Sequence, residues 1–293
     1  MQSKKIAVVG TPGGWSTERL ADALAERTGF RCVVDMAAVV GDLGRGEIRY
    51  QDVDLCRLDG VIIKKISPEY APDILDRLEL LRFAESRGVK VFSAPEKVIR
   101  VLDRLACTVT LRIAGVAMPP TTVTADLGGA RAAVADYGAA VCKPLFSTKA
   151  RGMIIVDDGP GAGEELAAFQ AAGNPVIYLQ QKIPDLGRDL GVVFLGGEYV
   201  ATYARVGAGT SWNTTIHDGG RYQAFAPSEA IIELARVAQA PFGLDFTCVD
   251  VALTPAGPQV FEVSAFGGFR GLLDAHGIDA AALYSDYVLG RLS

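Results

Sequence analysis

The sequence predicts a mixed α/β protein, in which a small parallel α/β unit precedes a longer part that is rich in β-strands. In residues 1–94, short apolar runs alternate with segments of helical periodicity, a pattern typical of a parallel sheet flanked by helices. One long helix is expected next, over about residues 96–114. Several short β-branched runs follow it, and Gly196-Gly197 lies between two of them as a hairpin turn.

The N-terminal unit is expected to contain four strands, at residues 6–9, 31–35, 60–63 and 89–92. A helix is expected at about 17–28, and a second one is indicated by the helical spacing of Ile74, Leu75, Leu78 and Leu81. The first turn, Gly10-Thr-Pro-Gly-Gly14, lacks the Gly-x-Gly-x-x-Gly spacing of dinucleotide-binding folds, and no acidic residue is well placed after the second strand. We therefore interpret it as a tight turn that could touch a substrate.

The helix at 96–114 is predicted to have one apolar face, formed by Val98, Val101, Leu102, Leu105, Val109 and Ile113. Gly115 and Pro119-Pro120 end it. Later strands are expected at residues 139–143, 153–156, 176–181, 190–195 and 199–205. Residues 207–227 lack periodicity and predict a functional loop, in which Trp212 and His217 are interpreted as packing residues rather than catalysts. A helix at 228–240 follows.

Composition limits the class of function. The 293 residues are 49% hydrophobic and 22% charged, with a net charge of −5 and scattered lysines and arginines, so nucleic acid is not expected as a partner. No apolar run approaches the ~20 residues of a membrane span, so no membrane partner is expected. Five cysteines without Cys-x-x-Cys spacing and only two histidines disfavour zinc sites and disulfides, and favour a reduced, cytoplasmic protein.

An acidic β-hairpin is the most informative motif of the chain. Two apolar, β-branched runs, which include residues 243–250 and 259–264, flank the turn Thr254-Pro-Ala-Gly257. If the turn is centred near Ala256, Asp250 lies opposite Glu262 and both share a face with Ser264. The other face is then expected to carry Val249, Val251, Leu253, Phe261 and Val263.

Opposed carboxylates on neighbouring strands are only ~5 Å apart and destabilise a hairpin, so this acidic pair needs a physical reason. We favour a divalent cation such as Mg²⁺, which takes a few carboxylates and fills its other positions with water and phosphates. The alternative is a solvated strand face that carries two unrelated acids.

Three cationic positions predict an anion-binding site. Lys143 ends an apolar strand, where it is expected to reach an anion; an exposed edge lysine is the alternative. The loop Ser147-Thr-Lys-Ala-Arg-Gly152 adds hydroxyls and cations that could cover phosphates, although it could also be a simple basic hairpin tip. Arg205 also ends a strand and suits the clamping of a phosphate or carboxylate, with a surface ion pair as the alternative.

Motifs between about Val61 and Leu272 follow one another in the order of a known superfamily. They are Val61-Ile-Ile-Lys-Lys-Ile66, Ser93-Ala-Pro-Glu, Asp103-Arg104, Gly115-Val-Ala-Met-Pro-Pro-Thr121, Lys143-Pro-Leu-Phe, Leu179-Gln-Gln-Lys-Ile183, Arg188-Asp-Leu and the two hairpin strands. The chain resembles the ATP-grasp superfamily and, within it, the RimK-like carboxylate–amine ligases. The resemblance implies an N-terminal α/β domain at 1–94, a linker helix and central lobe at 95–182, and a C-terminal lobe at 183–293. The two β-rich lobes would clasp ATP.

The resemblance also implies roles for individual residues. The residues implied to bind ATP are Arg104, Lys143, Ser147, Thr148, Lys149, Arg151, Gln181, Lys182, Ile183 and Asp189. Arg104 would replace a nucleotide-contacting lysine, residues 179–183 would form the adenine hinge, and Asp189 would approach the ribose. Asp250, Glu262 and Ser264 are the implied ligands of Mg²⁺ or Mn²⁺, and Arg205 and Lys143 are the implied catalytic residues.

Besides Arg104, the chain departs from the family pattern at five places. They are Ser264 in place of asparagine, Ser147–Gly152 in place of a glycine-rich flap, Gln181 in place of an acid, Gly191 in place of arginine, and Trp212-Asn-Thr-Thr215 in place of Trp-x-Thr-Asn. These positions cluster near the phosphates and the acceptor, so they indicate a changed substrate more than a changed fold.

The activity that the resemblance implies is ATP-dependent amide formation through an acyl phosphate, such as the ligation of glutamate. Transfer between anions depends on charge neutralisation and positioning, which the cations and the metal would supply. The flap would exclude water from the intermediate. Two alternatives stay open: a small-molecule kinase, and a nucleotide-binding regulatory protein without turnover. The expected partners are small-molecule or peptide carboxylates and amines, and a second copy of the chain in a dimer or tetramer.

Overall fold

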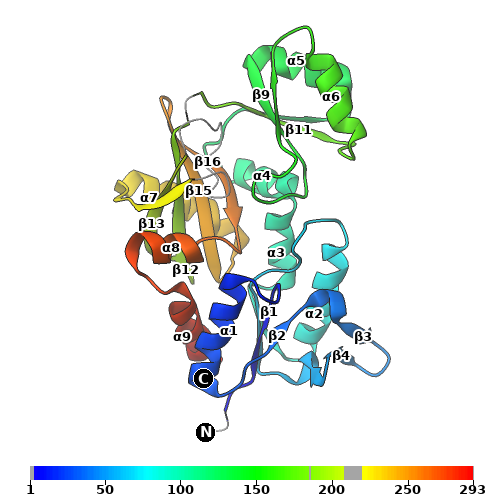
Figure 1. Cartoon of the computed structure of the whole chain (residues 1–293), viewed down its shortest axis with the longest axis vertical. Helices are drawn as coiled ribbons and strands as arrows, with labels where there is room; N and C mark the ends of the chain where they lie inside the picture. The colour runs from blue at the N-terminus through cyan, green and yellow to red at the C-terminus, as the bar shows by residue number, and fades with distance from the viewer. Residues whose placement is uncertain (1–2, 185, 208–219, 293) are drawn as a thin grey trace.

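The computed structural model describes residues 3–184, 186–207 and 220–292. Most of the predicted loop at 207–227, including Trp212, His217 and the motif Trp212-Asn-Thr-Thr215, lies outside the described residues. Three larger sheets and one small sheet form the body of the protein (Figure 1).

The first sheet is parallel and has the strand order β2-β1-β6-β7. Its strands are β1 (Ile6–Val9), β2 (Val33–Val34), β6 (Gly60–Ile63) and β7 (Lys90–Phe92), and its helices are α1 (Trp15–Thr28) and α2 (Ile74–Ser86). All four residues of β1 and of β6 are buried, which explains why they are uniformly apolar. A small antiparallel sheet of β3 (Val40–Asp42), β4 (Glu47–Tyr50) and β5 (Val53–Asp54) was not expected from the sequence.

The predicted helix at 96–114 is two helices, α3 (Pro95–Leu102) and α4 (Arg104–Ile113), so the prediction of one helix was wrong. Asp103 breaks it, because its backbone is extended and its side chain accepts a 2.8 Å hydrogen bond from the Leu105 N–H as an N-cap. The predicted apolar face is correspondingly split. α3 buries Val98 and Leu102, whereas Ile113 of α4 is 82% exposed.

The central sheet is antiparallel, with the order β10-β9-β11-β8. Its strands are β8 (Thr121–Thr124), β9 (Ala139–Lys143), β10 (Ile154–Asp157) and β11 (Ile177–Gln181). Helices α5 (Leu127–Tyr137) and α6 (Ala162–Ala171) pack on this sheet, and neither was predicted from the sequence. Half of their buried positions are alanines, and each helix buries only one or two larger side chains (Val134 in α5, Leu166 and Phe169 in α6), so the apolar periodicity is weak.

The C-terminal sheet is antiparallel, with the order β14-β13-β12-β15-β16. Its strands are β12 (Arg188–Leu195), β13 (Glu198–Val206), β14 (Arg221–Ala224), β15 (Phe246–Thr254) and β16 (Gly257–Ser264). α7 (Glu229–Gln239) packs with the Val249 and Val251 face, whereas α8 (Phe269–His276) packs with the Tyr203 and Cys248 face.

The last helix, α9 (Ala280–Leu292), returns to the start of the chain and packs against α1 (Figure 1). Tyr284 and Val288 of α9 share a core with Ile6 of β1 and Leu24 of α1. An ion pair between Arg27 and Asp286 also joins the two helices. Side chains of α9 therefore complete the hydrophobic core on one side of the N-terminal sheet.

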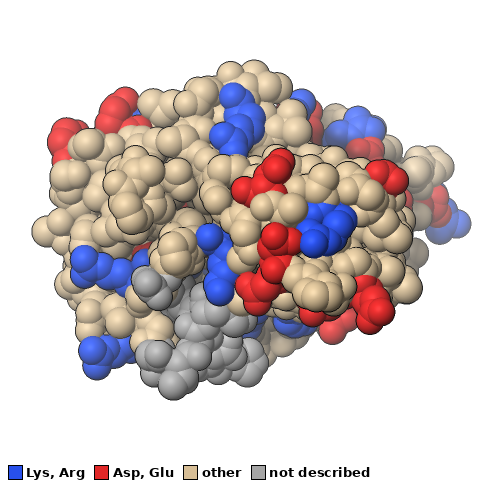
Figure 2. All heavy atoms as spheres, turned by 90° about the horizontal axis from the view of Figure 1, so that it is seen from above, with Lys and Arg blue, Asp and Glu red and all other residues tan. Residues whose placement is uncertain are grey.

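No described helix combines the length and the apolar character that a membrane crossing requires. The face in Figure 2 has its basic and acidic side chains interspersed, without a large patch of one sign.

Candidate active site

The acidic hairpin forms as predicted, with Asp250 of β15 directly opposite Glu262 of β16. The strands turn tightly between Thr254 and Gly257, and the register shifts next to Asp250, where β16 holds one extra residue. Phe261 is that residue, so its predicted place on the core face was wrong. It lines a cavity beside Glu262 instead, and the Lys143 ammonium lies 5.1 Å from its ring centroid.

Arg205, at the end of β13, bridges two carboxylates. It is paired across the sheet with Asp189 of β12, to which its Nε donates at 3.0 Å, and its Nη2 lies 2.9 Å from Asp250 Oδ1. Although burial opposes its charge, Asp189 and Asp250 keep the pKa of Arg205 well above its usual value. Burial raises the pKa of Asp250 to about 7, a rise that Arg205 opposes and Glu262 reinforces.

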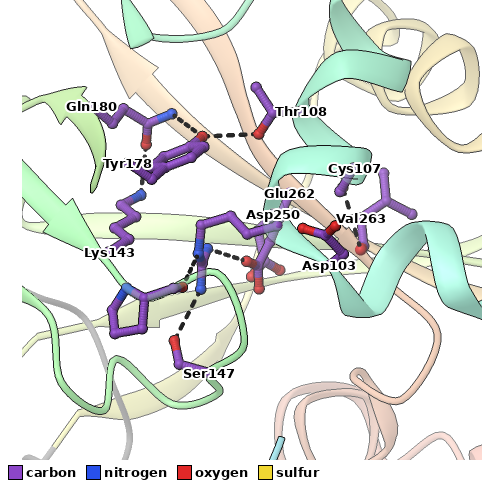
Figure 3. A network of polar contacts seen from close by, with 12 residues as sticks. Asp103, Cys107, Thr108, Lys143, Ser147, Tyr178, Gln180, Asp250, Glu262 and Val263 are labelled. Carbon is purple, nitrogen blue, oxygen red and sulfur yellow. Dashed lines mark hydrogen bonds and ion pairs between the residues drawn. The ribbon is translucent and has the colours of Figure 1, made fainter. Parts of the chain in front are cut away.

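Arg104, the first residue of α4, holds the second carboxylate of the pair. Its Nη1 donates a 3.0 Å hydrogen bond to Glu262 Oε2, and its Nε donates at 3.1 Å to the carbonyl of Pro144. Its Nη2 reaches Ser147 Oγ at 3.3 Å (Figure 3). One arginine from the linker helix therefore connects the acidic hairpin to the end of β9 and the start of the predicted flap.

Lys143, at the end of β9, is anchored by a polar network that the sequence analysis did not single out (Figure 3). Its Nζ donates a 2.6 Å hydrogen bond to Gln180 Oε1. Gln180 is 1% exposed, and its Nε2 donates to Thr121 Oγ1 at 3.3 Å and to the Tyr178 hydroxyl at 3.5 Å. The Tyr178 hydroxyl bonds Thr108 of α4 at 2.8 Å. The amide oxygen of Gln180 is thus held toward the lysine.

Burial and the nearby charge of Arg104 lower the pKa of Lys143 to about 7. Glu262 and Asp250 oppose this effect. A lysine in this state gains its full positive charge most readily when an anion is bound beside it, as expected of a phosphate-binding group.

Gln180→Leu should weaken ATP binding by about 10- to 100-fold, because a hydrogen bond to a charged group contributes about 1.5–3 kcal/mol. The Michaelis constant for ATP and the affinity for ADP by calorimetry measure this effect. Gln170→Leu is the control, since Gln170 is on α6 and its side chain donates to the backbone carbonyls of Ala125 and Pro175. Unchanged nucleotide affinity in Gln180→Leu would show that Lys143 needs no anchor.

The predicted flap turns toward the N-terminal domain. Lys149 and Ala150 have φ angles of 59° and 56°, in the left-handed region. Arg151 then donates at 3.2 Å to the Pro68 carbonyl, and its Nη1 lies 3.7 Å from Glu69. The cation of Arg151 therefore lies against the segment after β6 rather than beside Glu262.

The predicted adenine hinge continues from β11. The Gln181 N–H donates to the Pro120 carbonyl at 2.8 Å, and the Lys182 N–H donates to the Ala139 carbonyl at 3.0 Å. Ile183 follows as a partly buried residue. The N–H groups of Gln181 and Lys182 are thus bonded within the central lobe, and nucleotide contacts by this segment stay a prediction.

Ser264 ends β16, on the strand that carries Glu262. Its Oγ accepts hydrogen bonds from the N–H groups of Phe266 and Gly267, both at 3.2 Å. These two bonds engage the lone pairs of a hydroxyl oxygen, so Ser264 as placed has little capacity to hold a cation directly. Its role as the third metal ligand stays a prediction.

Several of the predicted site residues line one cavity, and others lie around it. Those in the cavity wall are Arg104, Ser147, Thr148, Lys149, Glu262 and Ser264, together with Phe261 and Tyr70. The volume is about 90 Å³, below the ~300–1,000 Å³ of ligand pockets. This cavity is therefore too small to hold a whole nucleotide.

The acidic pair fits a magnesium ion. The side chains of Asp250 and Glu262 are 17% and 41% exposed, so both carboxylates can be reached. In the ranges 3–184, 186–207 and 220–292, no group of three or more His, Cys, Asp or Glu residues is arranged around a metal position. Two protein carboxylates are a donor set that suits Mg²⁺, because this ion usually keeps waters and substrate phosphates in its other positions.

Comparisons with known proteins agree with this geometry. Residues 101–288 match the family described as the RimK-like ATP-grasp domain. A tetrahydromethanopterin:alpha-L-glutamate ligase of Methanosarcina acetivorans is 25% identical over 97% of this chain and 98% of its own. A probable alpha-L-glutamate ligase of Rhodopirellula baltica is 26% identical over 98% of this chain and 71% of its own.

Solved structures share the fold at lower identity. The ATP-grasp ligase PsnB, complexed with a precursor variant, Mg and ADP, superposes with a TM-score of 0.77, 18% identity and full coverage of both chains. A RimK domain protein of Sphaerobacter thermophilus gives a TM-score of 0.76 at 22% identity, over 98% of this chain and 100% of its own. The ATP-grasp fold predicted for this chain is therefore confirmed.

Proposed function

The chain belongs to the RimK-like ATP-grasp family, and from this membership we propose that it adds glutamate or a similar amino acid to a carboxylate acceptor. It is an ATP-dependent carboxylate–amine ligase that uses ATP and magnesium. The choice of glutamate is supported by relatives that are named alpha-L-glutamate ligases, at 24–27% identity. The acceptor is a small molecule or a peptide.

The observation that carries the proposal is the opposed pair Asp250 and Glu262. Arg205 contacts Asp250, and Arg104 contacts Glu262. Lys143 lies near this pair, over the ring of Phe261. A magnesium ion on the two carboxylates would neutralise phosphate charge and orient ATP for transfer. Lys143 and Arg104 would bind phosphate oxygens, since both are fixed by hydrogen bonds to neighbouring groups. These are the groups that positioning and electrostatic stabilisation require in phosphoryl transfer.

The other predicted residues have narrower proposed roles. Ser147, Thr148 and Lys149 would cover the phosphates, as supported by their place in the cavity wall. Arg205 would hold Asp250 in its ionised form, a role supported by its contact with that carboxylate and with Asp189. Arg151 would lock the closed flap through its contact with Glu69.

Three further points belong to the same proposal. We propose that Mn²⁺ can replace Mg²⁺, because carboxylate oxygens suit both ions. A cytoplasmic location is supported by five free cysteines, three of them buried. A homo-oligomer is proposed from the family resemblance alone.

The test is ADP formation by the purified protein with Mg-ATP, a panel of amino acids led by glutamate, and a panel of small carboxylates and short peptides. We expect ADP only when an acceptor and an amine are both present, with a product whose mass equals their sum minus one water. A phosphorylated product without an amide would select a kinase instead. Tight ATP binding without ADP formation would select a regulatory protein.

A further inference from the structure

Lys64 is a buried lysine that the ligase chemistry described above does not use. It follows β6, where its backbone N–H donates at 2.9 Å to the carbonyl of Val9. The residue is 2% exposed. Its ammonium group lies 4.0 Å from the ring centroid of Phe269 and 6.0 Å from that of Phe246, both in the C-terminal lobe. A side chain of the N-terminal sheet therefore ends inside the neighbouring lobe.

The hydrogen bond of Lys64 leads directly to the acidic hairpin. Its Nζ donates at 2.6 Å to the carbonyl of Phe266, in the loop that follows β16. The N–H of the same Phe266 donates to Ser264 Oγ at 3.2 Å, and Ser264 is two residues from Glu262. Two hydrogen bonds thus connect the N-terminal sheet with the end of the strand that carries a predicted metal ligand.

The loop that receives this bond is tightly constrained. Gly268 has a φ of 91°, and a Cβ at that position would lie 3.2 Å from Val193 and 3.3 Å from Phe246. A Cβ at Gly267 would lie 3.3 Å from Cys248. Since the loop lies this close to β12 and β15, a shift of the Phe266 peptide has little room to be absorbed there and would be passed on to Ser264.

A buried lysine in these surroundings is unfavourable for stability. Lysine is almost never fully buried unless it is paired, and Lys64 forms no ion pair with any residue that the structure describes. Burial lowers the pKa of Lys64 to about 7. One carbonyl and two aromatic faces compensate only partly for the lost hydration of the ammonium group. An apolar residue of similar length would fit a structural role better.

We propose that Lys64 is a positioning residue of the ligase: by holding the Phe266 peptide it makes the placement of Ser264 and the acidic hairpin depend on the docked N-terminal sheet. This role rests on the proposed magnesium site at Asp250 and Glu262. Lys64 touches neither nucleotide nor metal in this role, and acts through the loop after β16. Closure of the N-terminal domain and formation of a competent metal site are then one event.

Lys64→Met tests the proposal, because methionine has a similar length and cannot donate a hydrogen bond. We expect the Mg²⁺ concentration for half-maximal response to rise by about tenfold, the size of loss seen when groups that orient metal ligands are removed. The melting temperature without ligands should stay unchanged or rise. The Mg²⁺ response is measured by calorimetric binding of ADP as well as by turnover, so the result does not depend on knowing the acceptor.

Two further lysine variants sharpen the comparison. Lys64→Arg keeps a donor and should restore part of the Mg²⁺ response. Lys90→Met is the matched control, because Lys90 of β7 lies in the same sheet and over an aromatic ring, that of Phe92. A lower melting temperature of Lys64→Met with an unchanged Mg²⁺ response would assign Lys64 to stability alone and overturn the proposal.

Ser264→Ala removes the other hydrogen bond of this connection, the one from the Phe266 N–H to Ser264 Oγ. It keeps the proposal testable if Lys64→Met does not fold. We expect the same rise in the Mg²⁺ requirement, and no further rise when both substitutions are combined. A wild-type Mg²⁺ response in Ser264→Ala would overturn the proposal. Absence of Mg²⁺-dependent nucleotide binding in the wild-type protein would instead contradict the metal site itself.

Discussion

Glu262→Gln should lower the rate of ADP formation by about 10²–10³-fold, a loss typical of removing one electrostatic group from an active site. The amide keeps the shape of the side chain but loses the charge that faces Asp250 and that Arg104 binds at 3.0 Å. The fold should persist, since the Glu262 side chain is 41% exposed and the like-charge contact with Asp250 is relieved. Steady-state kinetics at saturating Mg-ATP and a thermal melt measure the two effects.

Glu233→Gln is the matched control, because Glu233 forms an exposed ion pair with Arg236 on α7, on a different element of the same lobe. It should leave the rate of ADP formation unchanged. Full turnover by Glu262→Gln would mean that the acidic hairpin is not the metal site.

Gly191→Arg, which introduces the residue usual in the family, should destabilise the protein by about 3 kcal/mol rather than improve the enzyme. Any Cβ at residue 191 would lie 2.3 Å from the ring of Tyr203, and one at Gly271 would lie 2.4 Å from the same ring. Tyr203 is 2% exposed between these glycines, and its hydroxyl contacts Cys248 Sγ at 3.3 Å, so the ring cannot move aside. Gly191→Ala should already show most of the loss, as a fall in melting temperature of roughly 6–12 °C.

Two comparisons isolate the contact with Tyr203. Gly163→Ala should leave the melting temperature unchanged or higher, because no atom lies within 4 Å of the added Cβ and the residue is helical. In the Tyr203→Leu background, Gly191→Ala should cost much less, since the clashing ring is gone. Equal losses in the two backgrounds would show that Tyr203 is not what requires glycine.

The acidic pair could be predicted because a hairpin is local. The alternation of Asp250 and Glu262 with apolar neighbours fixes which side chains meet once the turn is placed. The tight turn and the extra residue in β16 compensate each other, so Asp250 meets Glu262 although Phe261 leaves the core face. The sequence contains no clear signal for such a bulge, and that is why Phe261 was placed wrongly.

Other features depend on contacts between distant residues, which periodicity does not report. The partners of Lys64 and Lys143 are 202 and 37 residues away in sequence. The sequence places Arg205 as a cation at the end of a strand. Its contacts with both Asp189 and Asp250, however, depend on the pairing of β13, β12 and β15. The alanine-rich helices α5 and α6 were missed for a different reason, namely that half of the side chains that they bury are alanines, which leave few large apolar residues to mark a periodicity.

The return of α9 to α1 has a consequence for how the protein is made. The core around Ile6 and Leu24 is incomplete without Tyr284 and Val288, which the ribosome adds long after them. Until α9 has been synthesised, part of the apolar surface of the first sheet therefore stays exposed, and exposed apolar surface promotes aggregation. The order of folding thus differs from the order of the domains: the parallel sheet is translated before the other two large sheets, but its core is complete only after α9 has been made.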